Sequence, residues 1–392
     1  MLSKYRLVPN IKVGYNLYVL FAALFIGSRS TKYTLRVTQS IERIFGGSNV
    51  LMTSSGRSAL YFVLKYLPQS KVYIPAYTCD VVVEAALLAG KTIIYSHINE
   101  KTLNTDDYPG LDSDSIVIAT HQYGFPCRIK EICEECKQKG AVVIEDCAGA
   151  FGTAINGQPV GTFGDFAIFS FNASKLINSP STGGFLLVNN ENDYKALKDT
   201  IQFKPCTSKY KAKNLLKAIG FCVDKNAYIH YWLSKATRHD SSKAHITAAQ
   251  YGPKPEKLDE YMYGFYDWQA YVVLKQIRRL PELIMSRDEL KQVYIDNLTS
   301  VYQSRQFERQ GASIRYPVLI KNRDEIRQKA RTLGVEVGYG FEHFVCPDDY
   351  EKEIEIGKQI TYLPYSSHFR KKEINQIVKV LNQVSNEQSI NS

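Results

Sequence analysis

Seven short apolar runs alternate with helix-like segments between residues 49 and 189. They are VLMT (50–53), KVYIP (71–75), TIIYS (92–96), SIVIAT (115–120), AVVIED (141–146), FAIFSF (166–171) and GFLLV (184–188). Runs that are apolar on both faces and rich in Val and Ile are typical of strands covered by helices on both sides. Intervening segments such as 58–67 and 81–90 supply those helices, and the second ends in a glycine, a common helix terminator. The pattern predicts a three-layer α/β/α domain with a mostly parallel seven-stranded sheet.

The pattern changes after about residue 190. A basic, Tyr-rich stretch (194–250) leads to one long expected helix at 267–298. A last block mixes strand-like IRYPVLI (314–320) and VEVGYG (335–340) with expected helices at 323–333 and 372–384, which predicts a smaller α+β domain. We therefore expect an N-terminal apolar helical segment (1–48) that packs on the core, a large domain (49–270) and a small C-terminal domain (271–392).

The N-terminal segment carries an apolar stretch, YNLYVLFAALFIG (15–27), after Lys4, Arg6 and Lys12. This order of charge and apolar residues is also that of a signal peptide. The stretch is too short to span a bilayer as a helix, which needs about 20 residues. We expect a helix that packs on the protein or covers a partner, and peripheral membrane contact through 15–27 and secretion stay open as alternatives.

Composition narrows the class of protein. Among 392 residues, 44% are hydrophobic and 22% charged, which excludes disordered and fibrous classes. The net charge of +10 suits anionic partners such as phosphorylated small molecules, but the basic residues are too dispersed to indicate nucleic-acid binding. Cys127, Cys133 and Cys136 lack a second CxxC or a nearby histidine pair, so we expect inert thiols, no metal site and a cytoplasmic location.

Polar residues follow three of the predicted strands, at the sheet edge where open α/β sheets bind ligands. SSGRSAL (54–60) opens a helix, whose N-terminus favours anions; Asp146 ends the fifth run, and Lys175 follows the sixth. Singly, these residues are as well explained by a common turn, a capping aspartate and a solvated lysine. Together they are the three groups that pyridoxal phosphate needs: a phosphate cup, a carboxylate for the pyridine nitrogen and a Schiff-base lysine.

At these residues the sequence resembles the DegT/DnrJ/EryC1/StrS family of sugar aminotransferases, pyridoxal-phosphate enzymes of fold type I. The likeness is carried by SSGRSAL (54–60), IPAYTCDVVVEAALLAG (74–90), HQYG (121–124), VIEDCAGAFG (143–152), NGQPVGTFGDFAIFSFNASK (156–175) and TGGFLLVNN (182–190). Fainter matches extend it over roughly residues 35–385.

The resemblance implies roles for individual residues. Lys175 is the catalytic, Schiff-base lysine, and Asp146 is the partner of the pyridine nitrogen. Ser170 and the turn residues Gly56, Arg57, Ser58 and Ala59 hold the phosphate, and His121 lies beside the cofactor or the sugar.

Three positions depart from the family pattern. Gly149 stands where the family has Gln or His, and Cys79 stands where it has a ring-stacking aromatic, so Tyr77 is named as the replacement. Met262 and Gly264 stand where an Asn and an Arg are expected to reach the phosphate of the neighbouring subunit. Arg57 supplies a compensating charge on this interpretation.

These implications predict a homodimeric aminotransferase that moves an amino group, with glutamate as the expected donor, to a keto group of a nucleotide-linked sugar in surface polysaccharide or lipopolysaccharide synthesis. Two alternatives remain. A pyridoxal-phosphate-dependent sugar dehydratase of the same family carries histidine in place of Lys175, and a catalytically silent sugar-binding or regulatory relative would accommodate the three departures.

Overall fold

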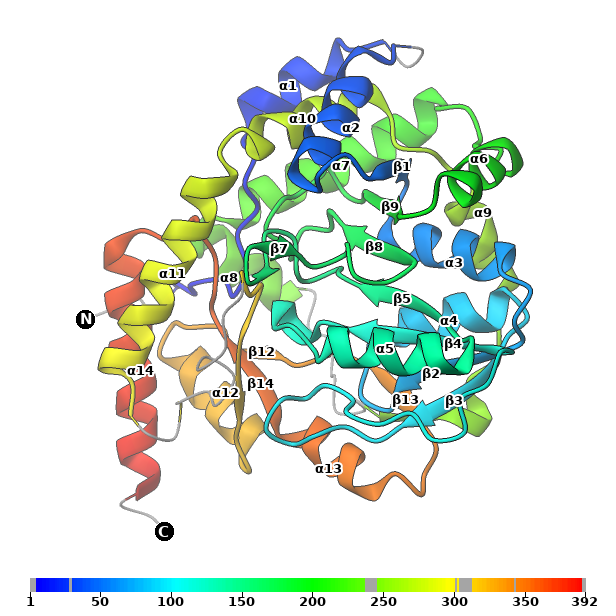
Figure 1. The fold of residues 1–392 in the computed structure, drawn as a ribbon. Helices are drawn as coiled ribbons and strands as arrows, with labels where there is room; N and C mark the ends of the chain where they lie inside the picture. Colours follow the sequence, from blue (N-terminus) through cyan, green and yellow to red (C-terminus); the bar gives the residue numbers. More distant parts are fainter. Residues whose placement is uncertain are drawn as a thin grey trace.

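The computed structural model describes residues 5–27, 30–236, 245–299, 302, 312–341 and 343–389. At its centre lies a seven-stranded sheet (Figure 1) with the strand order β1-β9-β8-β5-β4-β2-β3. Only β9 runs antiparallel to its neighbours. The strands are β1 (Asn49–Thr53), β2 (Lys71–Pro75), β3 (Thr92–Ser96), β4 (Ser115–Thr120), β5 (Val142–Asp146), β8 (Phe166–Ser170) and β9 (Gly184–Val188). All seven apolar runs form the predicted strands.

Alternate residues of each strand enter different cores, which explains why the runs are apolar on both faces. Ile116 and Ile118 of β4 pack under α3 (Gly56–Tyr66) and α4 (Asp80–Leu88), whereas Val117 packs under α5 (Ile129–Lys139) on the opposite face. On that second face, β8 and β9 contact α2 (Lys32–Ile44) and α10 (Asp267–Ile277). The predicted three-layer α/β/α architecture is confirmed.

A smaller unit follows the sheet along the chain. It contains the antiparallel sheet β11-β14-β12, made of β11 (Tyr316–Leu319), β14 (Ile360–Leu363) and β12 (Gly338–Tyr339). Its helices are α12 (Arg323–Thr332), α13 (Glu351–Gln359) and α14 (Lys371–Ser389). The single helix expected at 267–298 is instead two helices, α10 and α11 (Leu280–Asn297), because Pro281 starts a new helix at its first turn.

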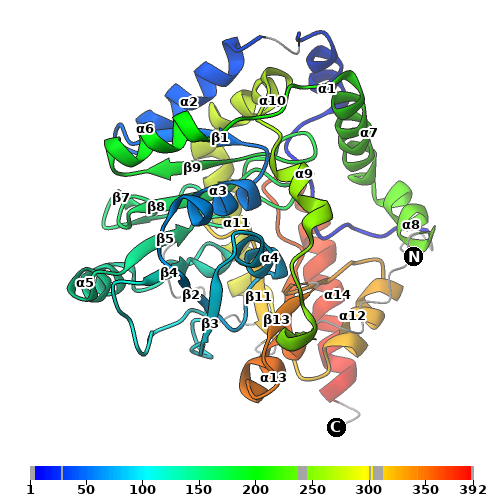
Figure 2. The same ribbon diagram turned by 90° about the vertical axis from the view of Figure 1, so that its right-hand side faces the viewer.

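The remaining elements are short or peripheral. They are α1 (Leu17–Leu24), α6 (Glu191–Thr200), α7 (Ser208–Asp224), α8 (Ala227–Ala236), α9 (Leu258–Tyr261), β6 (Ala154–Ile155), β7 (Gln158–Pro159), β10 (His245–Thr247), β13 (Phe344–Cys346) and the 3-10 turns Gln122–Gly124, Ala248–Gln250 and Pro255–Lys257. Figure 2 shows α1, α7 and α8 along one side of the molecule.

The N-terminal segment connects both units before the first strand of the large sheet begins. Val8 pairs with Val335 of the small unit, and the Lys12 ammonium donates to Glu373 of α14 at 2.7 Å. Further on, α2 packs along α10. Among the described residues, none of the helices is long and apolar enough to cross a membrane.

Candidate active site

A cavity of about 330 Å³ opens at the carboxyl ends of the parallel strands. Its walls combine the start of α3, the ends of β4, β5 and β8, the loop after β8, and three residues of the small unit: Ile314, Arg315 and Phe341. Two distant parts of the chain therefore enclose one site, at the sheet edge where the sequence placed its polar residues.

The first turn of α3 forms one wall. Ser55 caps the helix, because its hydroxyl oxygen accepts from the Ser58 amide at 3.1 Å. A side chain at Gly56 would begin 3.2 Å from the Phe169 carbonyl oxygen and from the Ser170 Cβ, so only glycine fits this close approach without movement. Ser55, Gly56 and Arg57 line the cavity, whereas Ser58 is buried beneath it with its hydroxyl 2.6 Å from that of Ser54.

Arg57 reaches the cavity but also has partners behind it. Its guanidinium lies 4.0 Å from the buried Glu84 carboxylate and over the ring of Tyr261. Although burial opposes ionisation of Glu84, bonds from Lys257 and Tyr261 hold the pKa of this carboxyl below its ordinary value. The positive charge of Arg57 is therefore shared between a buried anion and the cavity.

Asp146 ends β5 at the cavity wall. Its Oδ1 accepts from the Ala148 amide at 3.0 Å, and no other hydrogen bond to this carboxylate is found within the described part of the chain. Burial raises the pKa of Asp146 above its ordinary value, against the effects of that hydrogen bond and of Lys175. Such a carboxylate is satisfied by a ligand that brings a proton or a positive charge.

Lys175 lies half-buried in the loop that follows β8. Burial, reinforced by the charge of Arg315, lowers its pKa to about 8, while Asp146 acts in the opposite direction. In the ranges that the structure describes, its ammonium makes neither a hydrogen bond nor an ion pair. A lysine of this kind is a good nucleophile near neutral pH.

The loop that carries Lys175 is held by Asn178. Its amide nitrogen lies 3.2, 3.0 and 2.7 Å from the carbonyl oxygens of Asn172, Ala173 and Lys175. Its amide oxygen accepts from Gly14 at 2.7 Å, and its backbone exchanges two hydrogen bonds with the Gln276 side chain. The position of Lys175 thus depends on the N-terminal segment and on α10.

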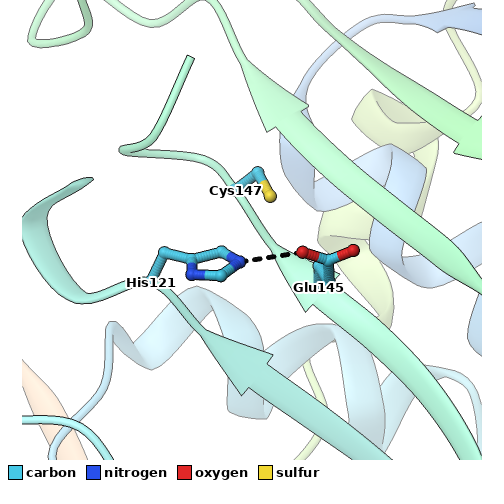
Figure 3. Close-up of side chains that lie close together, drawn as sticks. All are labelled: His121, Glu145 and Cys147. Atoms are coloured by element: carbon cyan, nitrogen blue, oxygen red, sulfur yellow. Dashed lines mark hydrogen bonds and ion pairs between the residues drawn. The ribbon is translucent and has the colours of Figure 1, made fainter. Parts of the chain in front are cut away.

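His121 lines the cavity, and its ring faces Glu145 (Figure 3), with Nε2 3.0 Å from Oε2. The Cys127 amide donates to Nδ1, so Nε2 carries the proton of the bond to Glu145. Cys147 completes a buried group with metal-ligating atoms within 4.8 Å of one another. However, the Glu145 oxygens already accept from Gly161, Phe163 and Gly164. We interpret this group as a buried hydrogen-bonded anchor for the His121 loop.

The structure places Gly149 and Cys79, two of the positions that depart from the family pattern, at the cavity. Gly149 lines the cavity, and a side chain there would begin 3.2 Å from the Gly124 nitrogen and from Ile314, so Gln or His at this position would require its neighbours to shift. Cys79 lines the cavity as well, and burial raises the pKa of its thiol to about 12.

The expectation that Tyr77 replaces the stacking aromatic is not supported. Tyr77 is fully buried, packs between Phe341 and Phe344, and places its hydroxyl 2.8 Å from that of Tyr123. The chain turns into α4 directly afterwards, so Thr78 and Cys79 face the cavity instead.

Among the cavity residues that the sequence analysis missed are Ser55 and Arg315. Ser55 had a local signal, because a serine before a glycine-started helix is a typical N-cap. Arg315 had none. It comes from the small unit, where its guanidinium lies 3.7 Å from the centre of the Tyr362 ring, and no ion pair to it is found in the described ranges.

Comparison with known proteins identifies the family. The sequence model of the DegT/DnrJ/EryC1/StrS aminotransferase family matches residues 28–382. The chain belongs to this family. Enzymes of the DegT/DnrJ/EryC1/StrS family depend on pyridoxal phosphate, which confirms the expected cofactor class.

Individual relatives agree with this assignment. Over 141 residues the chain is 33% identical to UDP-N-acetyl-3-dehydro-alpha-D-glucosamine 3-aminotransferase of Acidithiobacillus ferrooxidans, covering 34% of this chain and 38% of the relative. Over 174 residues it is 30% identical to GDP-perosamine synthase of Vibrio cholerae, covering 43% and 47%. The matched stretches thus span less than half the length of these two curated relatives.

Solved structures share the fold. PseC of Helicobacter pylori, an aminotransferase involved in the biosynthesis of pseudoaminic acid, matches with a TM-score of 0.73 at 13% identity, over 97% of this chain and 100% of that one. The sugar aminotransferase CalS13 of Micromonospora echinospora matches with a TM-score of 0.69 at 15% identity, over 96% and 99%. At these identities the likeness shows fold type I.

The residues of the cavity fit pyridoxal phosphate. The Asp146 carboxylate has spare hydrogen-bonding capacity for a protonated ring nitrogen, and Lys175 presents an amine with a lowered pKa. The start of α3, with Ser170 beside it, offers backbone amides and a hydroxyl suited to a phosphate. These groups lie around one cavity, so the family's cofactor has a place in this chain.

Proposed function

We propose that this protein is a homodimeric, cytoplasmic aminotransferase that moves an amino group, with glutamate as donor, to a keto group of a nucleotide-linked sugar. The observation that carries the proposal is that two residues from neighbouring strands line the same cavity as the start of α3. They are Asp146, at the end of β5, and Lys175, in the loop after β8. Surface polysaccharide or lipopolysaccharide synthesis is the process that such a product would serve.

The cavity residues divide the chemistry between them. When bound, pyridoxal phosphate supplies an electron sink for exchange of an amino group between an amino acid and a ketone. Asp146 keeps a proton on the ring nitrogen, and the start of α3 with Ser170 holds the phosphate. The Lys175 amine, with its pKa of about 8, would take a proton from the donor's α-carbon and deliver it to the C4′ carbon of the bound cofactor.

Arg315 is proposed as the anion-binding group for substrates. Its guanidinium stacks on Tyr362 at the cavity wall and leaves its donors for a ligand, such as the carboxylate of the donor or the diphosphate of the sugar nucleotide. The lysine with a lowered pKa argues against the dehydratase and the silent relative, because neither uses an amine at this position.

The test is a screen of the purified protein with glutamate against a panel of nucleotide-linked keto-sugars. We expect an amino-sugar product, and loss of both product and visible cofactor absorbance in Lys175→Ala with the fold intact by circular dichroism. Turnover of Lys175→Ala at the wild-type rate would contradict the assignment, and sedimentation of the active enzyme as a monomer would contradict the homodimer.

A further inference from the structure

Exposed apolar side chains gather on one face of the molecule. Twelve of the seventeen exposed large hydrophobic side chains found in the described ranges lie on α1 and the loop after it (five), α7 (two), α8 (four) and the adjoining Tyr5 (one). They are Tyr5, Leu17, Tyr18, Phe21, Leu24, Phe25, Leu216, Ile219, Tyr228, Ile229, Trp232 and Leu233. We call these twelve residues the apolar face. A gathering of exposed apolar side chains on neighbouring helices is typical of a binding surface.

Helix α1 contributes most strongly, because its sequence LYVLFAAL contains no charged residue. Leu20 and Ala23 pack on Leu215 and Ala218 of α7, which anchors one side of the helix. The other side is open, with Phe21 60% and Leu24 49% exposed. A helix that is apolar all round is normally covered on every side, so something covers this one in the working protein.

Helices α7 and α8 extend the face (Figure 2). The Lys211 ammonium donates to the Leu24 and Ile26 carbonyl oxygens, which joins α7 to α1. On α8, the ring of Trp232 stacks on Tyr5, and His230 is hydrogen-bonded to Glu336 of the small unit at 2.8 Å. The face is therefore built on helices that are firmly attached.

The charge carried by α1, α7 and α8 is mostly positive. Helix α7 carries four lysines and a single aspartate, α8 carries one lysine and no acid, and α1 carries neither. Lys209, Lys213 and Lys217 repeat at every fourth position of α7 and are exposed, and Lys235 lies beside Trp232. Lys209, Lys217 and Lys235 have no ion-pair partner among the described residues.

We propose that the apolar face binds the surface of an anionic phospholipid bilayer. The apolar side chains would insert between the lipid headgroups and the acyl chains. Tyrosine and tryptophan favour this interface because one end of each ring is apolar and the other is polar. The lysines would contact the anionic headgroups. A second copy is a poorer occupant, because a two-fold contact would bring the same lysines of both copies together. The sequence left such contact open as an alternative, through residues 15–27 alone, and the structure adds α7 and α8.

The test is flotation of the purified holoenzyme with vesicles of phosphatidylcholine, alone or with about one-third phosphatidylglycerol. The wild type should float with the anionic vesicles and be released by salt. A triple variant, Phe21→Ser with Phe25→Ser and Trp232→Ser, should lose this binding. Replacing Lys209, Lys217 and Lys235 by Gln should weaken it by about fivefold for each lysine.

The matched control replaces two exposed apolar residues elsewhere, Met285→Ser and Leu319→Ser, and should bind like the wild type. All variants are exposed-site changes, and retained turnover with unchanged Tm shows that they fold. Absence of flotation in the wild type, or equal flotation of the Phe21, Phe25 and Trp232 variant, would overturn the proposal. The proposal would also be overturned if that variant converted a dimer to a monomer, because the apolar face would then be the contact surface between two copies of the chain.

Discussion

The side-chain amide nitrogen of Asn178 lies 2.7 Å from the carbonyl oxygen of Lys175 and within 3.2 Å of two further carbonyl oxygens in the same loop. One buried side chain therefore sets the backbone from which the Lys175 amine enters the cavity. Because the Asn178 oxygen accepts from Gly14, the N-terminal segment takes part in this arrangement.

We expect Asn178→Ala to lower kcat strongly. Loss of the three carbonyl contacts lets the loop shift, and a misplacement of about 1 Å at a reacting group can cost about a hundredfold in rate. The matched control is Asn189→Ala. The Asn189 side-chain amide also donates to two carbonyl oxygens, those of Gly161 and Gly164, but these residues lie outside the cavity lining. Equal effects of the two variants on kcat would reduce Asn178 to a purely structural role.

The lowered pKa of Lys175 predicts the pH dependence of cofactor uptake. Below pH about 8 the amine is mostly protonated and unreactive, and above it the amine is neutral. The rate at which the apo-enzyme gains visible cofactor absorbance should therefore rise through pH about 8 and then level off. A midpoint near 10.5, the ordinary value for a lysine, would show that burial and Arg315 do not act on this amine.

Asp146→Asn should keep the cofactor bound but slow proton transfer by on the order of a hundredfold. The amide can still form a hydrogen bond to the ring nitrogen, yet it cannot stabilise a positive charge there. Single-turnover kinetics with glutamate measure this step. Asp165→Asn serves as control, since Asp165 is also a carboxyl with a raised pKa that accepts a backbone amide but lies outside the cavity lining.

Arg57→Ala should weaken cofactor affinity about ten- to a hundredfold if the guanidinium turns from Glu84 to the phosphate, since charge-assisted bonds contribute about 1.5–3 kcal/mol. Titration of the apo-enzyme with pyridoxal phosphate at two salt concentrations measures this. Lys65→Ala, an exposed charge further along α3, is the control. If Arg57→Ala lowers the Tm but leaves the affinity for pyridoxal phosphate unchanged, Arg57 serves only to neutralise the buried Glu84.

Arg315→Gln should have two effects. Removing a positive charge near Lys175 should move the pH midpoint of cofactor uptake upward from about 8, and loss of the anion-binding group should raise KM for glutamate more than it lowers kcat. Arg327→Gln is the control, because Arg327 also stacks on a tyrosine, Tyr339, but lies outside the cavity lining. An unchanged midpoint and KM would remove Arg315 from the proposed site.

The sequence by itself determined the large sheet and the identity of its central polar residues. A short apolar run is a local signal, so each strand could be predicted without knowing its neighbours. Parallel connections place the carboxyl ends of the parallel strands at the same edge. Asp146 and Lys175 could therefore be placed together in advance. The resemblance to the family added the cofactor and the reaction.

Only the tertiary structure decided which other groups surround that edge. Arg315 and Phe341 reach the cavity from a unit more than a hundred residues further along the chain, and no local pattern marks such an approach. Tyr77 shows the same limit, because its orientation depends on Phe341 and Phe344, which the sequence does not place beside it. The apolar face likewise depends on the packing of α1 against α7, since which side of a uniformly apolar helix is covered is decided by its neighbours.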